Sequence, residues 1–123
     1  MYLLRINGEK LDAEQKQYLK RVFGSELKIA HSKPLPQNPL EFLKMVREKL
    51  PVVAVEAPLY ILARLLPNRQ ELAIKFIMPV FRRDENDAQQ FSHYEEIISI
   101  TQEVFGEYTR ISLNTKPLIQ PLT

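Results

Sequence analysis

Polar side chains that could hold an anionic ligand follow one short apolar segment of the chain. His31, Ser32 and Lys33 come directly after residues 27–30. A histidine, a hydroxyl and a lysine together can bind a phosphate, and the histidine can act as a general base. The alternative is a solvated loop whose polar groups satisfy only their own backbone.

A second candidate for chemistry is Glu56, which ends the apolar run 52–55 and precedes Ala57-Pro58. A carboxylate buried at the end of a strand can serve as a general base. The alternative is that Glu56 faces water or interacts with the amides of the following helix. His31 and Glu56 are therefore the two candidates for a catalytic base.

Aromatic and basic residues occur together at two further positions. Tyr60 and Arg64 are four residues apart, so one helix face carries both, and the pair could stack on a base and bind a phosphate. Phe81, Arg82 and Arg83 open a polar loop, expected over residues 81–90, that could close over an anionic ligand. The alternative for Tyr60 and Arg64 is an ordinary surface pair. The alternative for Arg82 and Arg83 is a solvated charge cluster that the three acidic residues after them neutralise.

Motifs for metal, nucleotide or nucleophilic chemistry are missing from the sequence. The chain has no cysteine, and His93 has only His31 as a possible companion, whereas a catalytic metal needs about three protein ligands. The first turn, residues 6–9, lacks the dinucleotide fingerprint, and no GxxxxGK[ST] or G-x-S-x-G segment occurs. We expect no metal and no cofactor; a Ser-His-Asp arrangement stays open.

Composition predicts one globular domain of 123 residues, with 45% hydrophobic residues and a net charge of +2. This weak basic bias gives no reason to expect binding to duplex DNA. The N-terminus does not resemble a secretion signal, and the apolar runs are shorter than the roughly 20 residues of a membrane span. We expect a cytoplasmic protein with no membrane partner.

The pattern of apolar residues and turn signals predicts α/β architecture. Asp12 with Gln15, and Asn38 with Pro39, are typical helix starts. The expected strands cover residues 1–7, 27–30, 52–55, 72–80 and 95–100, and the expected helices cover 12–23, 39–50, 59–66 and 102–108. For 95–100 the alternative is part of a helix, and the isoleucines favour the strand. We predict a small Rossmann-like, mostly parallel sheet of four or five strands with flanking helices, in a single domain 1–115 with a flexible tail 116–123.

Two features of this prediction concern ligands and partners. In such sheets ligands bind at the carboxyl ends of the strands, where residues 7, 31–33 and 56 are expected. Asn7 therefore joins the candidate ligand contacts. The helix 59–66 is apolar nearly all round, so either the domain or a second copy of the chain must cover it.

Several of these segments resemble small ancillary proteins of type III CRISPR systems. The resemblance covers residues 1 to about 100 and is carried by short segments: LDAEQ at 11–15, PVVAV at 51–55, MPV at 78–80 and HYEEIISI at 93–100. These relatives are single Rossmann-like domains. The group includes ring nucleases, which degrade cyclic oligoadenylates, and proteins that bind these messengers. No catalytic motif of the group transfers residue by residue.

The resemblance implies that the chain binds a cyclic oligoadenylate, cyclic tetra-adenylate foremost, as a homodimer or higher oligomer and sequesters it in antiviral signalling. The first alternative is a metal-independent ring nuclease that positions a 2′-hydroxyl for attack on its own phosphate. The second is a protein-interaction domain with no small ligand. The expected ligand contacts are Asn7, His31, Ser32, Lys33, Tyr60, Arg64, Phe81, Arg82 and Arg83.

Overall fold

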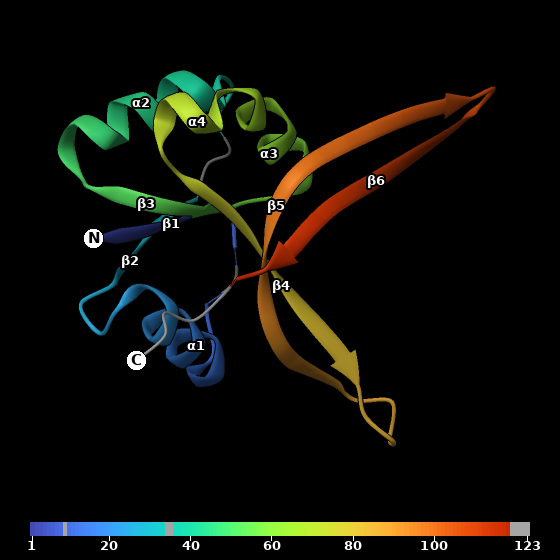
Figure 1. The fold of residues 1–123 in the computed structure, drawn as a ribbon, viewed down its shortest axis with the longest axis horizontal. Helices are drawn as coiled ribbons and strands as arrows, with labels where there is room; N and C mark the ends of the chain where they lie inside the picture. The colour runs from blue at the N-terminus through green and yellow to red at the C-terminus, as the bar shows by residue number, and fades with distance from the viewer. Residues whose placement is uncertain (9, 34–35, 119–123) are drawn as a thin grey trace.

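The computed structural model of the chain describes residues 1–8, 10–33 and 36–118 and contains a six-stranded mixed sheet in the order β2-β1-β3-β4-β5-β6 (Figure 1). Its elements in chain order are β1 (Tyr2–Ile6), α1 (Ala13–Phe23), β2 (Lys28–Ser32), α2 (Pro39–Lys49), β3 (Val52–Glu56), α3 (Leu59–Leu65), the 3₁₀ turn η1 (Leu66–Asn68), α4 (Arg69–Leu72), β4 (Lys75–Arg83), β5 (Gln89–Phe105) and β6 (Tyr108–Pro117).

The first half of the chain forms the parallel part of this sheet. β1 lies between β2 and β3, and β4 joins the far side of β3, all in the same direction. Helix α1 covers one face, and α2, α3 and α4 cover the other (Figure 1). Each face therefore has its own apolar core, one built around Leu43, Leu62 and Phe76 and the other around Leu19 and Tyr94.

The second half of the chain is antiparallel, which corrects the expected mostly parallel, Rossmann-like sheet of four or five strands. β5 pairs with β4 through its first half and with β6 through its second half. The two hairpins diverge from the body in different directions (Figure 1). These two ladders are longer than the parallel ones because β5 is 17 residues long. Direct hairpin turns replace the helical crossovers that parallel pairing requires.

The helix expected at 102–108 is wrong, since those residues belong to a hairpin. Phe105 pairs with Tyr108 across a two-residue turn in which Gly106 has φ +58°. A glycine with positive φ is typical of such tight hairpin turns. The β-branched and aromatic residues on both sides favour strands over a helix. The strand expected at 95–100 is confirmed as part of β5.

Local signals at the helix starts are confirmed. The side chain of Asp12 accepts a hydrogen bond from the Gln15 amide at 2.9 Å, and the Gln15 side chain accepts one from the Asp12 amide at 3.2 Å. Asn38 accepts a hydrogen bond from the Glu41 amide at 3.2 Å. The apolar helix α3 is covered within the chain itself, because Ile61, Leu62 and Leu65 are buried.

Candidate functional site

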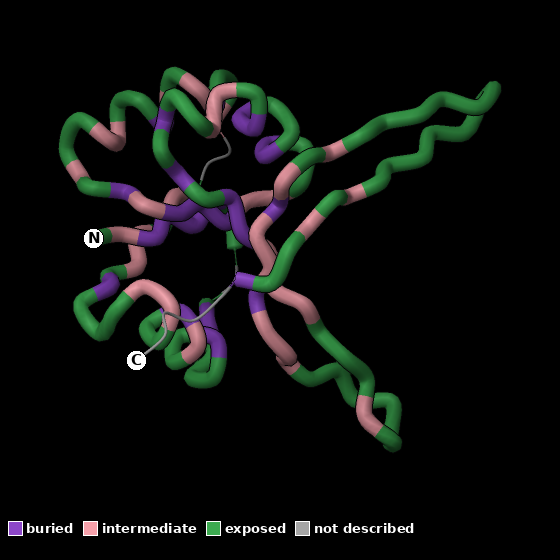
Figure 2. Tube along the Cα trace, in the orientation of Figure 1, coloured by how far each residue is buried: buried purple, intermediate pink, exposed green. Residues whose placement is uncertain are grey.

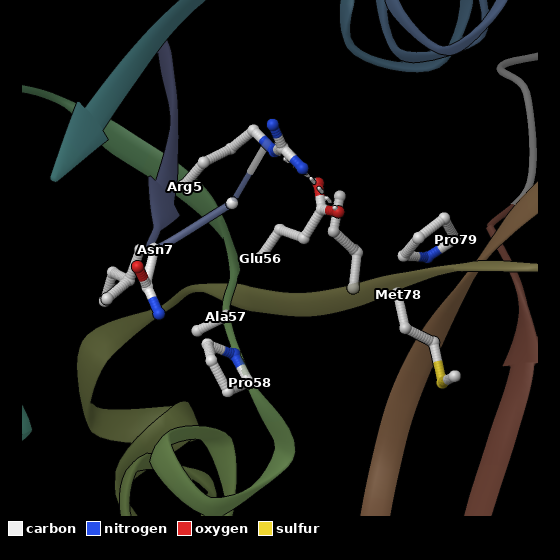
Figure 3. A pocket seen from close by; sticks show the side chains of 10 residues that line it. Arg5, Asn7, Glu56, Ala57, Pro58, Met78 and Pro79 are labelled. Carbon is white, nitrogen blue, oxygen red and sulfur yellow. Dashed lines mark hydrogen bonds and ion pairs between the residues drawn. The ribbon is translucent and has the colours of Figure 1, made fainter. Parts of the chain in front are cut away.

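A cavity of about 250 Å³ opens where β1 and β3 end beside the middle of β4 (Figure 3). Asn7 and Gly8 line it after β1, Ala57 and Pro58 after β3, and Met78 with its neighbours on β4. Asn7 has φ +54°, a conformation that asparagine tolerates better than most residues. The parallel strands thus form a depression at their carboxyl edge, as expected for this kind of sheet.

The wall of this cavity contains a buried ion pair. Arg5 and Glu56 are Cα partners in the β1–β3 ladder and are 7% and 8% exposed. Arg5 Nε donates to Glu56 Oε2 at 3.0 Å, and Arg5 Nη2 donates to Oε1 at 3.3 Å. Figure 3 shows the two side chains directed toward each other across the cavity wall. The two-point geometry matches the preferred pairing of guanidinium with carboxylate.

Two further side chains extend this pair into the core on the α1 side. Tyr94, which is fully buried, donates its hydroxyl to Glu56 Oε2 at 3.2 Å. Gln15 on α1 donates from Nε2 to the Tyr94 hydroxyl at 3.4 Å. The chain Arg5–Glu56–Tyr94–Gln15 therefore links β1, β3, β5 and α1 through hydrogen bonds that satisfy buried polar groups.

This network gives Glu56 a structural role. Both carboxylate oxygens accept hydrogen bonds from Arg5, and Oε2 also accepts one from Tyr94. A general base needs a lone pair directed at the substrate proton. The prediction that Glu56 acts as a base is not tested by this geometry, but its contacts favour an ion pair that holds the strands together.

The pKa of Tyr94 lies well above the usual range for a phenol. Burial is the largest cause, and the negative charge of Glu56 adds to it, while Arg5 acts in the opposite direction. Tyr94 therefore remains a neutral hydrogen-bond donor over the whole physiological pH range.

A second feature near the same edge is a basic groove between α1 and β2. It consists of two adjoining depressions, of about 230 and 300 Å³, which share Lys10 and His31. Gly8, Ser32 and Lys33 complete the first, and Lys16 and Lys20 from α1 contribute to the second. Among the described residues, none of these four lysines has an acidic partner within ion-pair distance.

The structure brings some of the predicted contacts together and separates others. His31 and Ser32 are the last residues of β2, not loop residues, and they lie with Lys33 in the basic groove. Tyr60 is 56% exposed on α3, and Arg64 Nη1 donates to the Gln37 carbonyl at 3.2 Å. Neither lines the carboxyl-edge cavity or the basic groove.

Phe81, Arg82 and Arg83 belong to β4, which corrects their placement in a loop. They continue the strand beyond the carboxyl-edge cavity into the β4–β5 hairpin. Phe81 packs against Phe91 with ring centroids 6.0 Å apart. Arg83 pairs with Asp87 at 3.1 Å across the hairpin turn. These arginines therefore stand apart from the lysines of the basic groove.

Sequence reasoning did not single out Arg5, Tyr94 or the lysines of α1. Arg5 was detectable in principle, because it is the one charge inside the apolar run 2–6. A charged side chain in a buried strand requires a partner of opposite charge. Arg5 therefore predicts an acidic residue on a neighbouring element of the fold. Lys16 and Lys20 resemble an ordinary solvated helix face in the sequence, and only their position beside β2 in the structure distinguishes them.

His93 takes part in a chain of hydrogen bonds on β5. Its Nδ1 lies 2.8 Å from Ser92 Oγ, and its Nε2 lies 2.9 Å from Glu95 Oε1. Thr115 on β6 donates to Glu95 Oε2 at 2.5 Å. These bonds to Thr115 and His93 lower the pKa of Glu95. The residue types resemble a catalytic triad, but the bonds run along β5 and across to Thr115, so they join β5 to β6.

Within residues 1–8, 10–33 and 36–118, no three histidine, cysteine, aspartate or glutamate side chains are grouped so that they could hold a metal ion. No helix in this part of the chain has the length and apolar character needed to cross a membrane.

Comparison with protein-family models, with curated proteins and with solved structures finds no match for this chain. The resemblance to type III CRISPR ancillary proteins stays a prediction.

Proposed function

We propose that this protein binds a phosphate-rich ligand in the basic groove between α1 and β2. The observation that carries the proposal is the row of cations Lys10, Lys16, Lys20, His31 and Lys33 along two adjoining depressions. Because the net charge is only +2, this row is a local concentration of charge rather than a general surface property. Successive phosphates of one ligand would meet successive cations.

A cyclic oligoadenylate is the ligand that this proposal favours, with cyclic tetra-adenylate first. Such a ring carries several phosphates at regular spacing, which a row of lysines can contact together. We also propose that the protein acts as an oligomer in the cytoplasm, where the absence of cysteine suits a reducing environment.

Binding is favoured over cleavage by the contacts of the candidate bases. Glu56 is committed to Arg5 and Tyr94, so His31 is the remaining candidate in the groove. A ring nuclease that works by positioning a 2′-hydroxyl is therefore the second candidate, with His31 as its base. A protein-interaction domain that contains no ligand site is the third.

The test is a titration of the purified protein with cyclic tri-, tetra- and hexa-adenylate, with linear oligoadenylate and duplex DNA as comparison ligands. Chromatography of the ligand after incubation separates binding from cleavage. Tight binding of an intact ring supports the proposal, and linear products would make the protein a ring nuclease. Failure to bind any of the rings would contradict the cyclic ligand and favour the interaction domain.

A charge-reversal pair locates the binding. The double variant Lys10→Glu/Lys33→Glu is expected to abolish binding, since both lysines line the groove. Lys44→Glu/Lys49→Glu on α2 is the charge-matched control, because both lysines are exposed on the opposite side of the sheet. Equal loss of affinity in both variants would show that net charge, not the groove, is responsible.

A further inference from the structure

The hairpin of β5 and β6 extends away from the body of the protein as an arm, residues 99–114 (Figure 1). Figure 2 shows that it is exposed along almost its whole length. Large hydrophobic side chains lie in the open here: Val104 is 69% exposed, Phe105 58%, Tyr108 79% and Ile111 56%. Large exposed apolar patches of this kind mark interaction sites.

The strand register divides the arm into two faces. Directly opposite residues in an antiparallel pair share a face, and faces alternate along each strand. One face, which we call the uncharged face, carries three cross-strand pairs: Ile100 with Leu113, Gln102 with Ile111, and Val104 with Thr109. The opposite face carries the charges, since Glu103 pairs there with Arg110.

The uncharged face continues the hydrophobic core out of the body. Ile100 at the base of the arm packs against the core cluster that includes Leu66 and Leu72. Beside Ile100 lies a depression of about 380 Å³, bordered by Ala63, Leu66 and Arg69 from the helical side. The arm therefore begins beside an open depression lined by apolar and polar residues and ends at a tip that exposes Phe105 and Tyr108.

We propose that this arm is a dimerisation device whose occupant is a second copy of the chain. The two arms lie antiparallel about a two-fold axis, with their uncharged faces together and each tip in the depression at the base of the partner's arm. This inference rests on the arm alone and is independent of the proposed ligand.

The arrangement is self-complementary in shape and polarity. Antiparallel stacking places the tip pair Val104 and Thr109 over the base pair Ile100 and Leu113 of the other copy. The middle pair, Gln102 with Ile111, then lies over the same pair of the second copy at the two-fold axis. The two glutamine amides can hydrogen-bond to each other there, because an amide both donates and accepts. No charged side chain is buried between the uncharged faces, so no desolvation of charge opposes the contact.

The tip also suits the depression. Phe105 and Tyr108 point away from the uncharged face, so they would face the helical wall formed by Leu66 and its neighbours. Glu103 and Glu107 near the tip would meet Arg69, the cation of that wall. Opposite charges therefore flank an apolar contact, as in specific interfaces.

The area is sufficient for a specific dimer. The exposed parts of Val104, Phe105, Tyr108 and Ile111 amount to on the order of 500 Å² per chain, since an aromatic side chain alone presents about 150–250 Å². Two copies bring about 1,000 Å² together before the depression is counted, which reaches the threshold of about 1,000 Å² for a biological interface.

The first measurement is molecular mass by light scattering at increasing concentration, without ligand. The wild-type chain is expected at twice the mass of one chain, and Ile111→Glu at the mass of one chain. Ser112→Glu, on the opposite face of the same arm, should retain the dimer. Circular dichroism checks that each variant is folded. A wild-type chain that stays monomeric throughout would overturn the proposal.

Cysteine cross-linking tests the orientation of the arms, because the natural chain has no cysteine. Ile111→Cys lies at the proposed axis, so oxidation should join two chains through one disulfide. Ser112→Cys should stay unlinked. Cross-linking of Ser112→Cys as readily as Ile111→Cys would rule out stacking through the uncharged face.

Discussion

Arg5 and Glu56 are 51 residues apart in the sequence and face each other as direct partners in the β1–β3 ladder, joined by hydrogen bonds of 3.0 and 3.3 Å. The pair lies at the carboxyl edge, where β1 and β3 end beside the cavity. It fixes the register of two neighbouring strands at the point where ligands bind in sheets of this kind.

Glu56→Gln is expected to lower the free energy of unfolding by about 3–5 kcal/mol, because Arg5 would lose the buried carboxylate that accepts from its Nε and Nη2. Urea denaturation measures this loss. Glu71→Gln is the control, since Glu71 forms an exposed pair with Lys44 at 4.0 Å and should change stability by less than about 1 kcal/mol. Similar losses in the two variants would mean that the buried pair contributes no more than a surface pair.

Gly8→Ala is expected to destabilise the protein by about 1–3 kcal/mol through overpacking. A Cβ at this position would lie 2.7 Å from Arg5 Nη2 and 2.8 Å from Arg5 Cζ. The guanidinium cannot withdraw without breaking its bonds to Glu56. In the double variant Gly8→Ala/Glu56→Gln, the loss of unfolding free energy should therefore be smaller than the sum of the two single losses. In the control Gly106→Ala/Glu56→Gln, with Gly106 at the distant arm tip, the two losses should add. If the losses of Gly8→Ala and Glu56→Gln also add, the proposed contact between the new Cβ and the Arg5 guanidinium is wrong.

Alkaline titration should show that Tyr94 keeps its proton in the folded state. Burial and the charge of Glu56 raise its pKa above the ordinary value of about 10. The folded state holds this proton more tightly than the unfolded state, so the associated stability is complete below about pH 10 and falls by about 1.4 kcal/mol per pH unit above it.

At alkaline pH the folded wild-type protein should show the same phenolate absorbance as folded Tyr94→Phe, because Tyr94 keeps its proton. In urea the wild-type protein should exceed the variant by the absorbance of one tyrosine. Ionisation of all five tyrosines while the circular dichroism spectrum stays native would show that Tyr94 is accessible to solvent.

Removal of single lysines should weaken ligand binding stepwise. Lys10→Ala and Lys33→Ala are each expected to lower affinity about tenfold, since a charged hydrogen bond contributes about 1.5 kcal/mol. Isothermal titration calorimetry at several salt concentrations measures both affinity and its salt dependence. The slope against salt should decrease with each lysine removed and stay unchanged in Lys49→Ala. An unchanged slope in the Lys10 and Lys33 variants would move the ligand away from the groove.

The local elements were largely predictable because their determinants are close in sequence. The capping residue Asp12 and its partner Gln15 are three residues apart, and both hydrogen bonds form. The segment 102–108 shows the limit of such signals. Gly106 can end a helix or form a hairpin turn, and only the pairing of Phe105 with Tyr108 decides between them.

The candidate site was predictable in part. The carboxyl edge was expected from the strand–helix order, and it holds Asn7, Glu56 and the residues 31–33 near one another. The contacts of Glu56 with Arg5 and Tyr94 were not predictable, because they depend on strand partners 51 and 38 residues away. The separation of Arg82 from the lysines of α1 was not predictable either, because β4 continues to Arg83 and carries Arg82 into the β4–β5 hairpin.

By itself the sequence determined where α1 and α2 begin, the apolar strands of the first half of the chain and the carboxyl edge, since hydrophobic periodicity and capping act over a few residues. Only the tertiary structure decided that the second half of the chain pairs antiparallel, that Glu56 is bound to Arg5 and Tyr94, and that the lysines of α1 lie beside His31. These outcomes depend on register and packing between distant segments, which local patterns do not encode.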